Sequence, residues 1–545
     1  TCGGSGLNER ARYVLLGDKG IHDFMDMSVA DAIAFIDSIA RRSASVEKVG
    51  EAVARLREQL YYLKEVGLAY LQLNRSYASL SGGEAQRVRL GTQLGIGLSG
   101  VLYILDEPSI GLHPADHRRL IECLQTLQKR GNALIVVEHD EETIRRADHL
   151  IELGPGAGER GGQLIYSGTP ADCGENTQSR TGAYLTGSVR VERSAPPKEA
   201  VAGWLTVRGA RGHNLKNLDV SIPRGLFTVF CGVSGSGKSS LVNDILAAES
   251  LRRLQGSKSI PLPHDRIEGL DSFRSAVRVD QSPIGRSPRS NPATYMKIFD
   301  ALRKLFAQCS LSRIRGYSAG RFSFNTQGGR CEKCKGDGQI KMDMHFMDDV
   351  FVTCPSCQGQ RYNRETLEVL YKGYSIADVL NLTVSEARSL FKNHSVLSNK
   401  LELLESVGLD YIRLGQPSQT LSGGESQRIK LALELSKRTK GHTLYILDEP
   451  TTGLHWDDVQ KLLDLLFRLR DEGNTLVLIE HHMDVIKLAD WLMELGPGGG
   501  EKGGHLIFSG TVEEMKTSAS TPTAEFLRNQ LAVIQSSFHR SPTSQ

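Results

Sequence analysis

A nine-residue run in the middle of the chain, GVSGSGKSS, has the residue types and spacing that bind a nucleoside triphosphate. It matches the pattern GxxxxGK[ST] at every fixed position. Glycines let backbone N–H groups wrap around phosphates, the lysine reaches the β- and γ-phosphates, and the serine hydroxyl binds Mg²⁺. A chance glycine-rich turn is the alternative interpretation. The predicted nucleotide ligands in this run are Gly232, Gly235, Gly237, Lys238, Ser239 and Ser240.

Two adjacent carboxylates follow the apolar run LYIL and could supply the rest of this chemistry. At the end of a buried strand, Asp448 is placed to hold Mg²⁺ together with Ser239, and Glu449 is placed to polarise the attacking water. His481 follows the next apolar run, TLVLI, and is predicted to contact the γ-phosphate. The alternatives are solvated loop charges for the two acids and a structural role for the histidine.

Four cysteines form two Cys-x-x-Cys pairs separated by nineteen residues: Cys331, Cys334, Cys354 and Cys357. This spacing predicts one tetrahedral Zn²⁺ site, and four thiolates leave no open position for water, so the metal is expected to be structural. The residues between the pairs alternate apolar and polar types, which predicts a β-hairpin closed at its base by the metal. His345 lies in this hairpin and is expected to be a surface residue. A redox dithiol pair is the alternative.

The elements that must position these residues are short apolar strands alternating with helices. LFTVFC precedes the phosphate-binding run and SLVNDILAAES follows it, while the acids and the histidine come at strand ends. VLYIL, LYIL, ALIVV and TLVLI are all predicted to be buried strands. This alternation indicates an α/β fold with a mainly parallel sheet.

An internal repeat organises most of the chain. LSGGEAQRVRL begins at Leu80 and LSGGESQRIKL begins at Leu421, an offset of 341 residues. VLYILDEPSIGLH ends at His113 and TLYILDEPTTGLH ends at His455, an offset of 342. A period this long indicates two tandem modules rather than a solenoid.

The repeated motifs resemble those of ABC-type ATPases: LSGGE is similar to the signature, LDEP to the Walker B strand and EH to the switch. In that family the signature loop of one module closes over the nucleotide held by the other. The resemblance implies that Ser81, Gly82 and Gly83 cap the nucleotide of the second module. It also adds a third catalytic residue, Gln281, which matches the family's Q-loop that links Mg²⁺ and nucleotide to an inserted domain.

The two modules are unequal, because the phosphate-binding run occurs once in this sequence. The first module has its own Asp106, Glu107 and His139, and the second has its own signature loop at Ser422, but these residues lack a phosphate loop to act on. Phosphoryl transfer depends on positioning and charge neutralisation. We therefore expect one ATP site per chain.

A long insertion separates Lys238 from the second signature at Ser422, a distance of 184 residues. Its segments DQSPIGRSPRSNPATY, GRFSFNTQGGRCEKCKGDG and RYNRETLEVLYKG closely resemble the second half of the UvrA family, the damage-sensing ATPases of bacterial nucleotide excision repair. The resemblance runs through essentially the whole chain, and more weakly through residues 9–60. It implies damaged double-stranded DNA as ligand, a homodimer, UvrB as a partner of the family, and ATP, Mg²⁺ and Zn²⁺ as cofactors.

The sequence departs from a complete UvrA, which adds an N-terminal phosphate loop, a UvrB-binding domain and an earlier insertion. TCGGSGLN aligns with SCQGQRYN, so that Cys2 falls on Cys357 and resembles half of a second Cys-x-x-Cys pair. We therefore expect a C-terminal portion of a UvrA or a truncated paralogue.

Charge is unevenly distributed along the chain. Residues 271–341 contain fourteen Lys and Arg against five Asp and Glu, a net charge of +9, whereas the whole chain carries +3. A basic segment beside a zinc hairpin is typical of a nucleic-acid footprint, and the alternative is a solvated face that binds nothing. The predicted DNA contacts are Arg286, Arg289 and Arg303.

Composition excludes several classes. The chain has 545 residues with 39% hydrophobic and 24% charged residues, which suits globular domains and not a disordered or disulfide-rich chain. No apolar run approaches the roughly 20 residues of a bilayer-spanning helix, and no secretory signal is present, so we expect a cytoplasmic protein without a membrane partner.

Two other functions are weighed. An ABC-type ATPase for transport or antibiotic resistance needs neither the cysteines nor the basic insertion. A metal-dependent nuclease is the other candidate, but nothing in this sequence resembles a two-metal cleft.

The expected domain organisation follows from the repeat and the insertion. The predicted segments are a remnant of the first-module signature region (1–79), the first ABC module without a phosphate loop (80–186), a linker (187–203), the phosphate-loop part of the second module (204–255), the inserted signature domain with its zinc hairpin (256–420), the rest of the second module (421–516) and a C-terminal tail (517–545).

Overall fold

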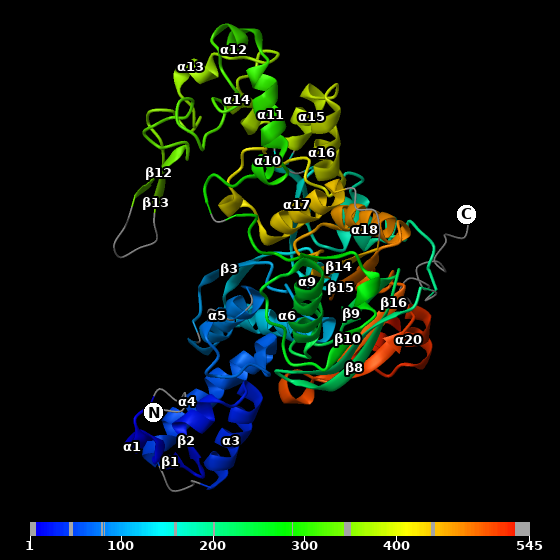
Figure 1. Ribbon diagram of the computed structural model, residues 1–545. Coiled ribbons are helices and arrows are strands. Elements are labelled where there is room, and N and C mark those ends of the chain that lie inside the picture. The colour runs from blue at the N-terminus through cyan, green and yellow to red at the C-terminus, as the bar shows by residue number, and fades with distance from the viewer. Residues whose placement is uncertain are drawn as a thin grey trace, which may run out of the picture.

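The computed structural model describes residues 7–42, 47–77, 80, 82–96, 98–156, 158, 161–199, 202–285, 287–342, 350–437 and 442–528. A central body of sheets and helices carries two projections: the N-terminal helices at one end, and at the other the insertion with its hairpin (Figure 1). None of the helices in these ranges combines the length and the apolar character needed to cross a bilayer.

A six-stranded sheet forms the centre of the second module. Its first five strands in spatial order are parallel and the last is antiparallel, which confirms the predicted mainly parallel α/β sheet. The spatial order is β11 (Ser275–Val279), β14 (Thr443–Asp448), β15 (Thr475–Ile479), β9 (Phe227–Cys231), β16 (Trp491–Gly496) and β17 (His505–Gly510).

Both faces of this sheet are covered, which explains why its strands read as continuous apolar runs. A three-stranded antiparallel sheet and the helix η5 bury one face. Helix α18 packs on the other, where the ring centroids of Phe227 and Phe467 are 5.3 Å apart. The other elements of the second module are β7 (Trp204–Gly212), β8 (Leu215–Pro223), η5 (Ser240–Ala247), α9 (Ala248–Gln255), β10 (Arg266–Glu268), η6 (Leu270–Ser272), α17 (Gly423–Ser436), α18 (Trp456–Asp471), α19 (Met483–Ile486), η8 (Gly500–Lys502) and α20 (Val512–Ser518).

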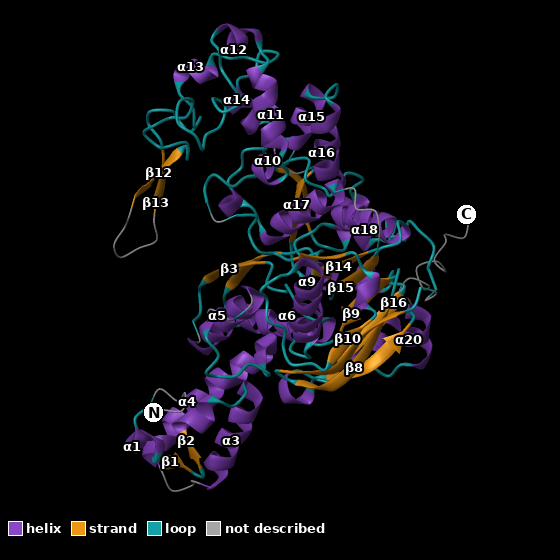
Figure 2. Ribbon diagram, viewed as in Figure 1, coloured by secondary structure: helices purple, strands orange, loops and turns teal. Residues whose placement is uncertain are grey.

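The insertion consists mostly of helices and loops, and the predicted hairpin projects from it to one side (Figure 2). Its apolar side chains share one continuous core with α18, and Phe299 stacks on Phe324 with ring centroids 4.6 Å apart. The elements are α10 (Pro292–Tyr295), α11 (Ile298–Ala307), α12 (Ser310–Ile314), β12 (Gln339–Met342), β13 (Val350–Thr353), α13 (Arg364–Leu367), α14 (Ile376–Asn381), α15 (Val384–Leu390), α16 (Ser395–Ser406) and η7 (Ser418–Thr420).

The described residues of the first repeat contain three separate two-stranded sheets, β1–β2 antiparallel, β3–β4 parallel and β5–β6 antiparallel. Helices α5 and α6 cover one face of β3–β4. Its elements are α1 (Glu9–Arg12), β1 (Leu15–Leu16), β2 (Lys19–Gly20), α2 (Ile21–Met25), α3 (Val29–Arg42), α4 (Glu47–Leu63), η1 (Lys64–Leu68), α5 (Gly82–Ile96), β3 (Leu102–Asp106), α6 (Pro114–Lys129), β4 (Ala133–Val137), α7 (Glu141–Arg146), β5 (Leu150–Gly154), β6 (Gln163–Gly168), η4 (Asp172–Glu175) and α8 (Arg180–Leu185).

The prediction that VLYIL and ALIVV are buried strands is wrong for one face of the first repeat. Ile104 is 69% exposed, whereas its counterpart Ile446 is 1% exposed. Leu153 on β5 is 67% exposed, whereas its counterpart Leu495 is fully buried. In the second repeat this face is covered by β7, β8 and η5, and the described residues of the first repeat contain no equivalent cover.

The segment predicted as a linker is fixed to the second module over its described part. Arg193 forms an ion pair with the buried Asp490, which also accepts a hydrogen bond of 3.0 Å from Nη1 of the fully buried Arg470. A buried carboxylate held between two guanidinium groups is costly to break. This contact ties residues 187–199 to the module that follows them.

Candidate active site and metal centre

The phosphate-binding run lies between β9 and η5, as predicted. Its three glycines have φ values of +123° at Gly232, +73° at Gly235 and +103° at Gly237, a region that other residues rarely adopt. Lys238 Nζ donates to the carbonyl oxygens of Gly232 at 2.8 Å and Val233 at 2.9 Å. Burial lowers the pKa of Lys238 to about 8. The lysine therefore lies folded over its own loop, at the positions where phosphate oxygens bind in such loops.

The surroundings of this loop fit a phosphate group. Ser236 Oγ is buried without a hydrogen-bond partner among the described residues. Asn214, in the turn between β7 and β8, donates from Nδ2 to the carbonyl oxygens of Gly235 at 2.8 Å and Gly500 at 3.0 Å. Ser240 points elsewhere, since its Oγ lies 3.0 Å from Nδ1 of His213. Asn214 thus fixes the loop from outside, while the hydroxyl group of Ser236 is available to bind a phosphate oxygen.

The acids come at the end of β14, as predicted. Asp448 accepts a hydrogen bond of 2.8 Å from Nδ2 of Asn243 on η5. Glu449 has the left-handed φ of +45°, and its Oε1 lies 3.7 Å from Nε2 of His481. Burial, followed by the neighbouring charges of Asp448 and Glu480, raises the pKa of Glu449 to about 8. Strained backbone at a buried carboxyl is typical of functional sites.

Histidine and glutamine complete this edge of the sheet. Burial and then Lys238 hold the pKa of His481 well below its ordinary value, and its Nδ1 has no partner among the described residues. Gln281 Nε2 lies 3.4 Å from the carbonyl oxygen of Glu449 and 3.3 Å from Oγ1 of Thr452. The structure therefore brings together the predicted lysine, both acids, the histidine and the glutamine.

The first repeat reproduces the geometry of the acid and the histidine. Glu107 has a φ of +44°, and its Oε1 lies 3.7 Å from Nε2 of His139. Burial raises the pKa of Glu107, with Asp106 as the next cause. The same strain and the same distance in both copies show that this arrangement belongs to the repeated unit.

The two repeats meet at the phosphate loop. Ser234 in the loop donates from its backbone N–H to Oδ2 of Asp116 at 3.3 Å and from its hydroxyl to the carbonyl oxygen of Gly111 at 3.2 Å. The carboxylate of Glu449 lies against Gly111, where an added methyl group would be 3.3 Å from its oxygens. Glu107 lies against Gly453 in the same way, at 3.0 Å. Each glutamate therefore contacts the other repeat.

The role of the predicted capping residues stays a prediction. Ser81 lies outside the described residues, while Gly82 and Gly83 begin helix α5. A cavity of about 800 Å³ between the repeats is lined by both glutamates, by His139 and His481 and by aromatic side chains.

Sequence patterns did not identify Asn214, Asn243, Asp116 or Gly111, because these residues reach the site from other elements. Repetition at matched positions is the available signal: Gly111 and Gly453 occur in the two GLH segments.

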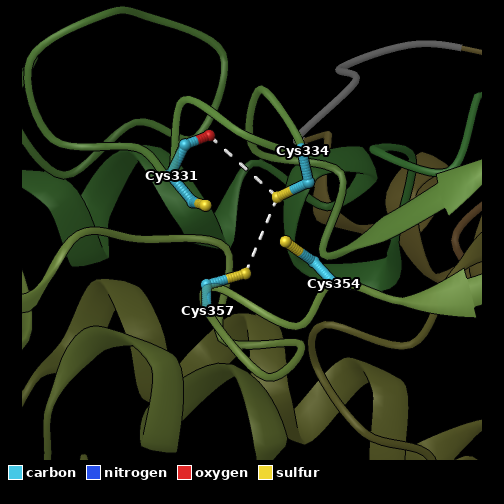
Figure 3. A group of neighbouring side chains, drawn as sticks. All are labelled: Cys331, Cys334, Cys354 and Cys357. Atoms are coloured by element: carbon cyan, nitrogen blue, oxygen red, sulfur yellow. Dashed lines mark hydrogen bonds between the residues drawn. The ribbon is translucent and has the colours of Figure 1, made fainter.

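The four predicted zinc ligands form one cluster (Figure 3). Their sulfur atoms lie within 4.8 Å of one another, all four residues are buried, and their side chains point toward a common centre. The sulfur atoms of Cys334 and Cys357 are 3.6 Å apart, close to the separation of about 3.8 Å expected around tetrahedral zinc. Burial favours the neutral thiol of Cys354, but backbone donors at Cys357 and Ser356 outweigh it and lower its pKa to about 7. The donor set fits Zn²⁺.

The predicted hairpin extends from this cluster. β12 pairs antiparallel with β13, with Gln339 opposite Thr353, which confirms the predicted hairpin. Its tip, including His345, lies outside the described residues, as does Arg286. Arg289 Nε lies 2.6 Å from Oδ1 of Asp337. Arg303 pairs with its helix neighbour Asp300. The DNA-contact assignment of these arginines stays a prediction.

The parallel sheet, the phosphate loop and the paired repeats define an α/β protein with the ABC-ATPase fold. UvrABC system protein A of Methanothermobacter thermautotrophicus is 55% identical over 531 residues, which cover 97% of this chain and 55% of that relative. The corresponding protein of Aquifex aeolicus is 52% identical over 532 residues, 97% of this chain and 58% of that relative. The crystal structure of UvrA2 from Deinococcus radiodurans matches with a TM-score of 0.90 and 46% identity, covering 97% of this chain and 66% of that one. No protein-family model matches.

The chain belongs to the UvrA family. It spans about half the length of the curated relatives it matches.

Proposed function

We propose that this chain is an ATP-hydrolysing, DNA-binding protein that recognises damaged or distorted duplex DNA in nucleotide excision repair. One observation carries the proposal: the same chain joins an ABC-type phosphate-loop site to a four-cysteine cluster on a basic insertion. The relatives named UvrABC system protein A support the same function. A lesion would be recognised through the deformability and backbone geometry of the duplex rather than through base edges.

Each residue of the site has a separate role in ATP hydrolysis. Lys238 exchanges the carbonyl oxygens it now contacts for phosphate oxygens and neutralises their charge. Glu449 and His481, 3.7 Å apart, orient the attacking water beside the γ-phosphate. Ser239 and Asp448 would hold Mg²⁺, which would supply charge neutralisation. Gln281 joins this edge to the insertion through Thr452.

Nucleotide titration tests the ATP site. We expect one tightly bound ATP per chain, lost in Lys238→Ala because the main charge clamp is gone. Glu449→Gln should bind ATP with nearly normal affinity and hydrolyse it at least about a hundredfold more slowly, since it cannot accept a proton. Isothermal titration gives the stoichiometry and a phosphate-release assay gives the rate. Two comparable sites per chain, or undiminished hydrolysis by Glu449→Gln, would contradict the assignment.

Salt-dependent binding tests the DNA interface. Reversing Arg286 and Arg289 to Glu should weaken binding to all duplexes and lower the slope of log K against log salt by about two, because each arginine displaces roughly one counterion. Fluorescence anisotropy at several salt concentrations measures both. The control reverses Arg55 and Lys129, exposed residues of the first repeat. Zinc content is measured in parallel, since Arg289 pairs with Asp337 beside the cysteines.

Unchanged DNA affinity and salt slope after charge reversal at the insertion would remove this site from the DNA interface.

The protein partners belong to the same proposal. A homodimer and a contact with UvrB follow from the family relationship, and sedimentation of the chain with and without UvrB tests both.

A further inference from the structure

Tyr70, in the first repeat, lies against the phosphate loop of the second. A methyl group added at Gly235 would lie 2.7 Å from both Cγ and Cδ2 of the tyrosine, and one added at Gly499 would lie 3.1 Å from its Cβ. These distances place the ring directly on the glycine backbones. Only glycine permits so close an approach, and Gly235 also has a φ of +73°. The tyrosine therefore rests on the loop that holds the triphosphate.

The hydroxyl group of Tyr70 connects the loop to the signature helix. Oη donates a hydrogen bond of 2.7 Å to Oε1 of Glu84, which is 7% exposed and lies in the first turn of α5. Hydrogen bonds from a neutral donor to a buried carboxylate are strong and directional. Burial, and then Glu84, raise the pKa of Tyr70, so the phenol remains a donor at ordinary pH. One side chain thus touches the phosphate loop with its ring and the signature helix with its hydroxyl.

The second repeat contains the same tyrosine and glutamate, with one difference. Tyr411 Oη donates to Oε1 of Glu425 at 2.7 Å, and a methyl group added at Gly158 of the first repeat would lie 3.1 Å from Tyr411 Cβ. Each tyrosine therefore rests on a glycine loop of the opposite repeat. Only Tyr70 meets a phosphate loop among the described residues. A substitution at Tyr411 can therefore distinguish two roles of Tyr70: docking of the two repeats, which both tyrosines would share, and nucleotide chemistry, which Tyr411 would not share.

We infer that Tyr70 is a positioning residue for ATP hydrolysis, which couples the phosphate loop of the second repeat to signature helix α5 of the first through Glu84. The inference rests on the proposed ATPase function and adds a residue that no nucleotide-binding motif contains. The coupling depends on one hydrogen bond: the ring contacts the loop at Gly235, and the hydroxyl group binds Glu84 in the first turn of α5.

The test is a double-mutant cycle on the full chain, with Tyr70→Phe, Glu84→Gln and the double variant. Tyr70→Phe keeps the ring and removes the hydrogen bond. We expect kcat to fall about tenfold, because a bond to a buried charge is lost, while Kd for a non-hydrolysable ATP analogue changes less than about twofold. The double variant should be no slower than Glu84→Gln, since that variant already weakens the Tyr70–Glu84 bond and also the ion pair of Glu84 with Arg75 at 3.4 Å.

Tyr411→Phe is the matched control, because it removes the equivalent bond to Glu425 from a tyrosine that contacts Gly158 instead of the phosphate loop. We expect its kcat and Kd to stay within about twofold of the parent protein, and thermal unfolding of all variants reports any loss of folding. Equal losses of kcat in Tyr70→Phe and Tyr411→Phe, or normal hydrolysis by Tyr70→Phe, would overturn the inference alone. A parent chain that binds no nucleotide would overturn the proposed function with it.

Discussion

At the scale of single residues, the environment of Glu449 decides its protonation. The carboxyl is half-buried between His481 and Gly111, with 23% of its side chain exposed, and its neighbours Asp448 and Glu480 are acidic. Its pKa of about 8 means that the unliganded protein holds a proton on Glu449 at neutral pH. A base must lose that proton before it can accept one from water, and the neighbouring charge of Lys238 favours that loss because it lowers the pKa of Glu449.

The raised pKa predicts a pH-dependent difference in stability between the parent protein and Glu449→Gln. Between the ordinary value of 4.5 and about 8, the folded state keeps a proton that the unfolded state has lost. Glu449 therefore stabilises the fold most at low pH, and this contribution is lost as pH rises through 8. From pH 5 to pH 9 the variant should gain at least about 1.4 kcal/mol of unfolding free energy over the parent.

Urea unfolding of the unliganded proteins at the two pH values measures this gain. Glu472→Gln, on an exposed position after α18, controls for removal of a carboxylate alone. A constant difference between Glu449→Gln and the parent across this range would show that the carboxyl is ionised throughout.

At the same scale, motif residues could be predicted from the sequence and their supports could not. Lys238, Asp448 and Glu449 lie in patterns whose chemistry fixes residue type and spacing. Asn214 and Tyr70 approach the loop from other elements, and only tertiary packing brings them there. The tyrosine–glutamate pair does recur at an offset of 341, so repetition is the signal that could have found it.

At the scale of elements, alternation and cysteine spacing predicted the hairpin of the insertion, and the structure confirms it. A two-stranded hairpin is marginally stable alone. β12 and β13 are also substantially exposed along their length. The energy that orders them must therefore come from the base, where the cysteine cluster lies.

Removing one sulfur ligand should release the hairpin and spare the ATPase core. We expect Cys334→Ser to lose about one equivalent of Zn²⁺ and to exchange its amide hydrogens much faster in β12 and β13, with unchanged protection in β14 and β15. Metal analysis and hydrogen exchange measure these effects. Cys309→Ser, a half-buried cysteine outside the cluster, is the control. Less than about half an equivalent of zinc in the parent protein would contradict the site.

At the scale of the whole molecule, the two repeats share local structure and differ in what covers their sheets. Apolar runs alone predicted buried strands in both, since a run such as VLYIL does not reveal whether a second layer is present. In the first repeat β3 and β4 bury one face against helices, and β3, β4 and β5 all expose Ile or Leu side chains. Exposed apolar surface of this extent is unusual on a folded domain.

The final prediction compares matched positions of the two repeats. Ile151→Ser with Leu153→Ser should change the free energy of unfolding by less than about 1 kcal/mol, because both side chains are more than 60% exposed, and should reduce binding of a hydrophobic dye. Their counterparts Met493 and Leu495 are fully buried, so the same double substitution there should cost about 4 kcal/mol or more. Urea unfolding and dye titration measure both, at two protein concentrations. Equal destabilisation at the two sites would show that the exposed face is covered in solution, and a dependence on concentration would identify the cover as a second copy of the chain.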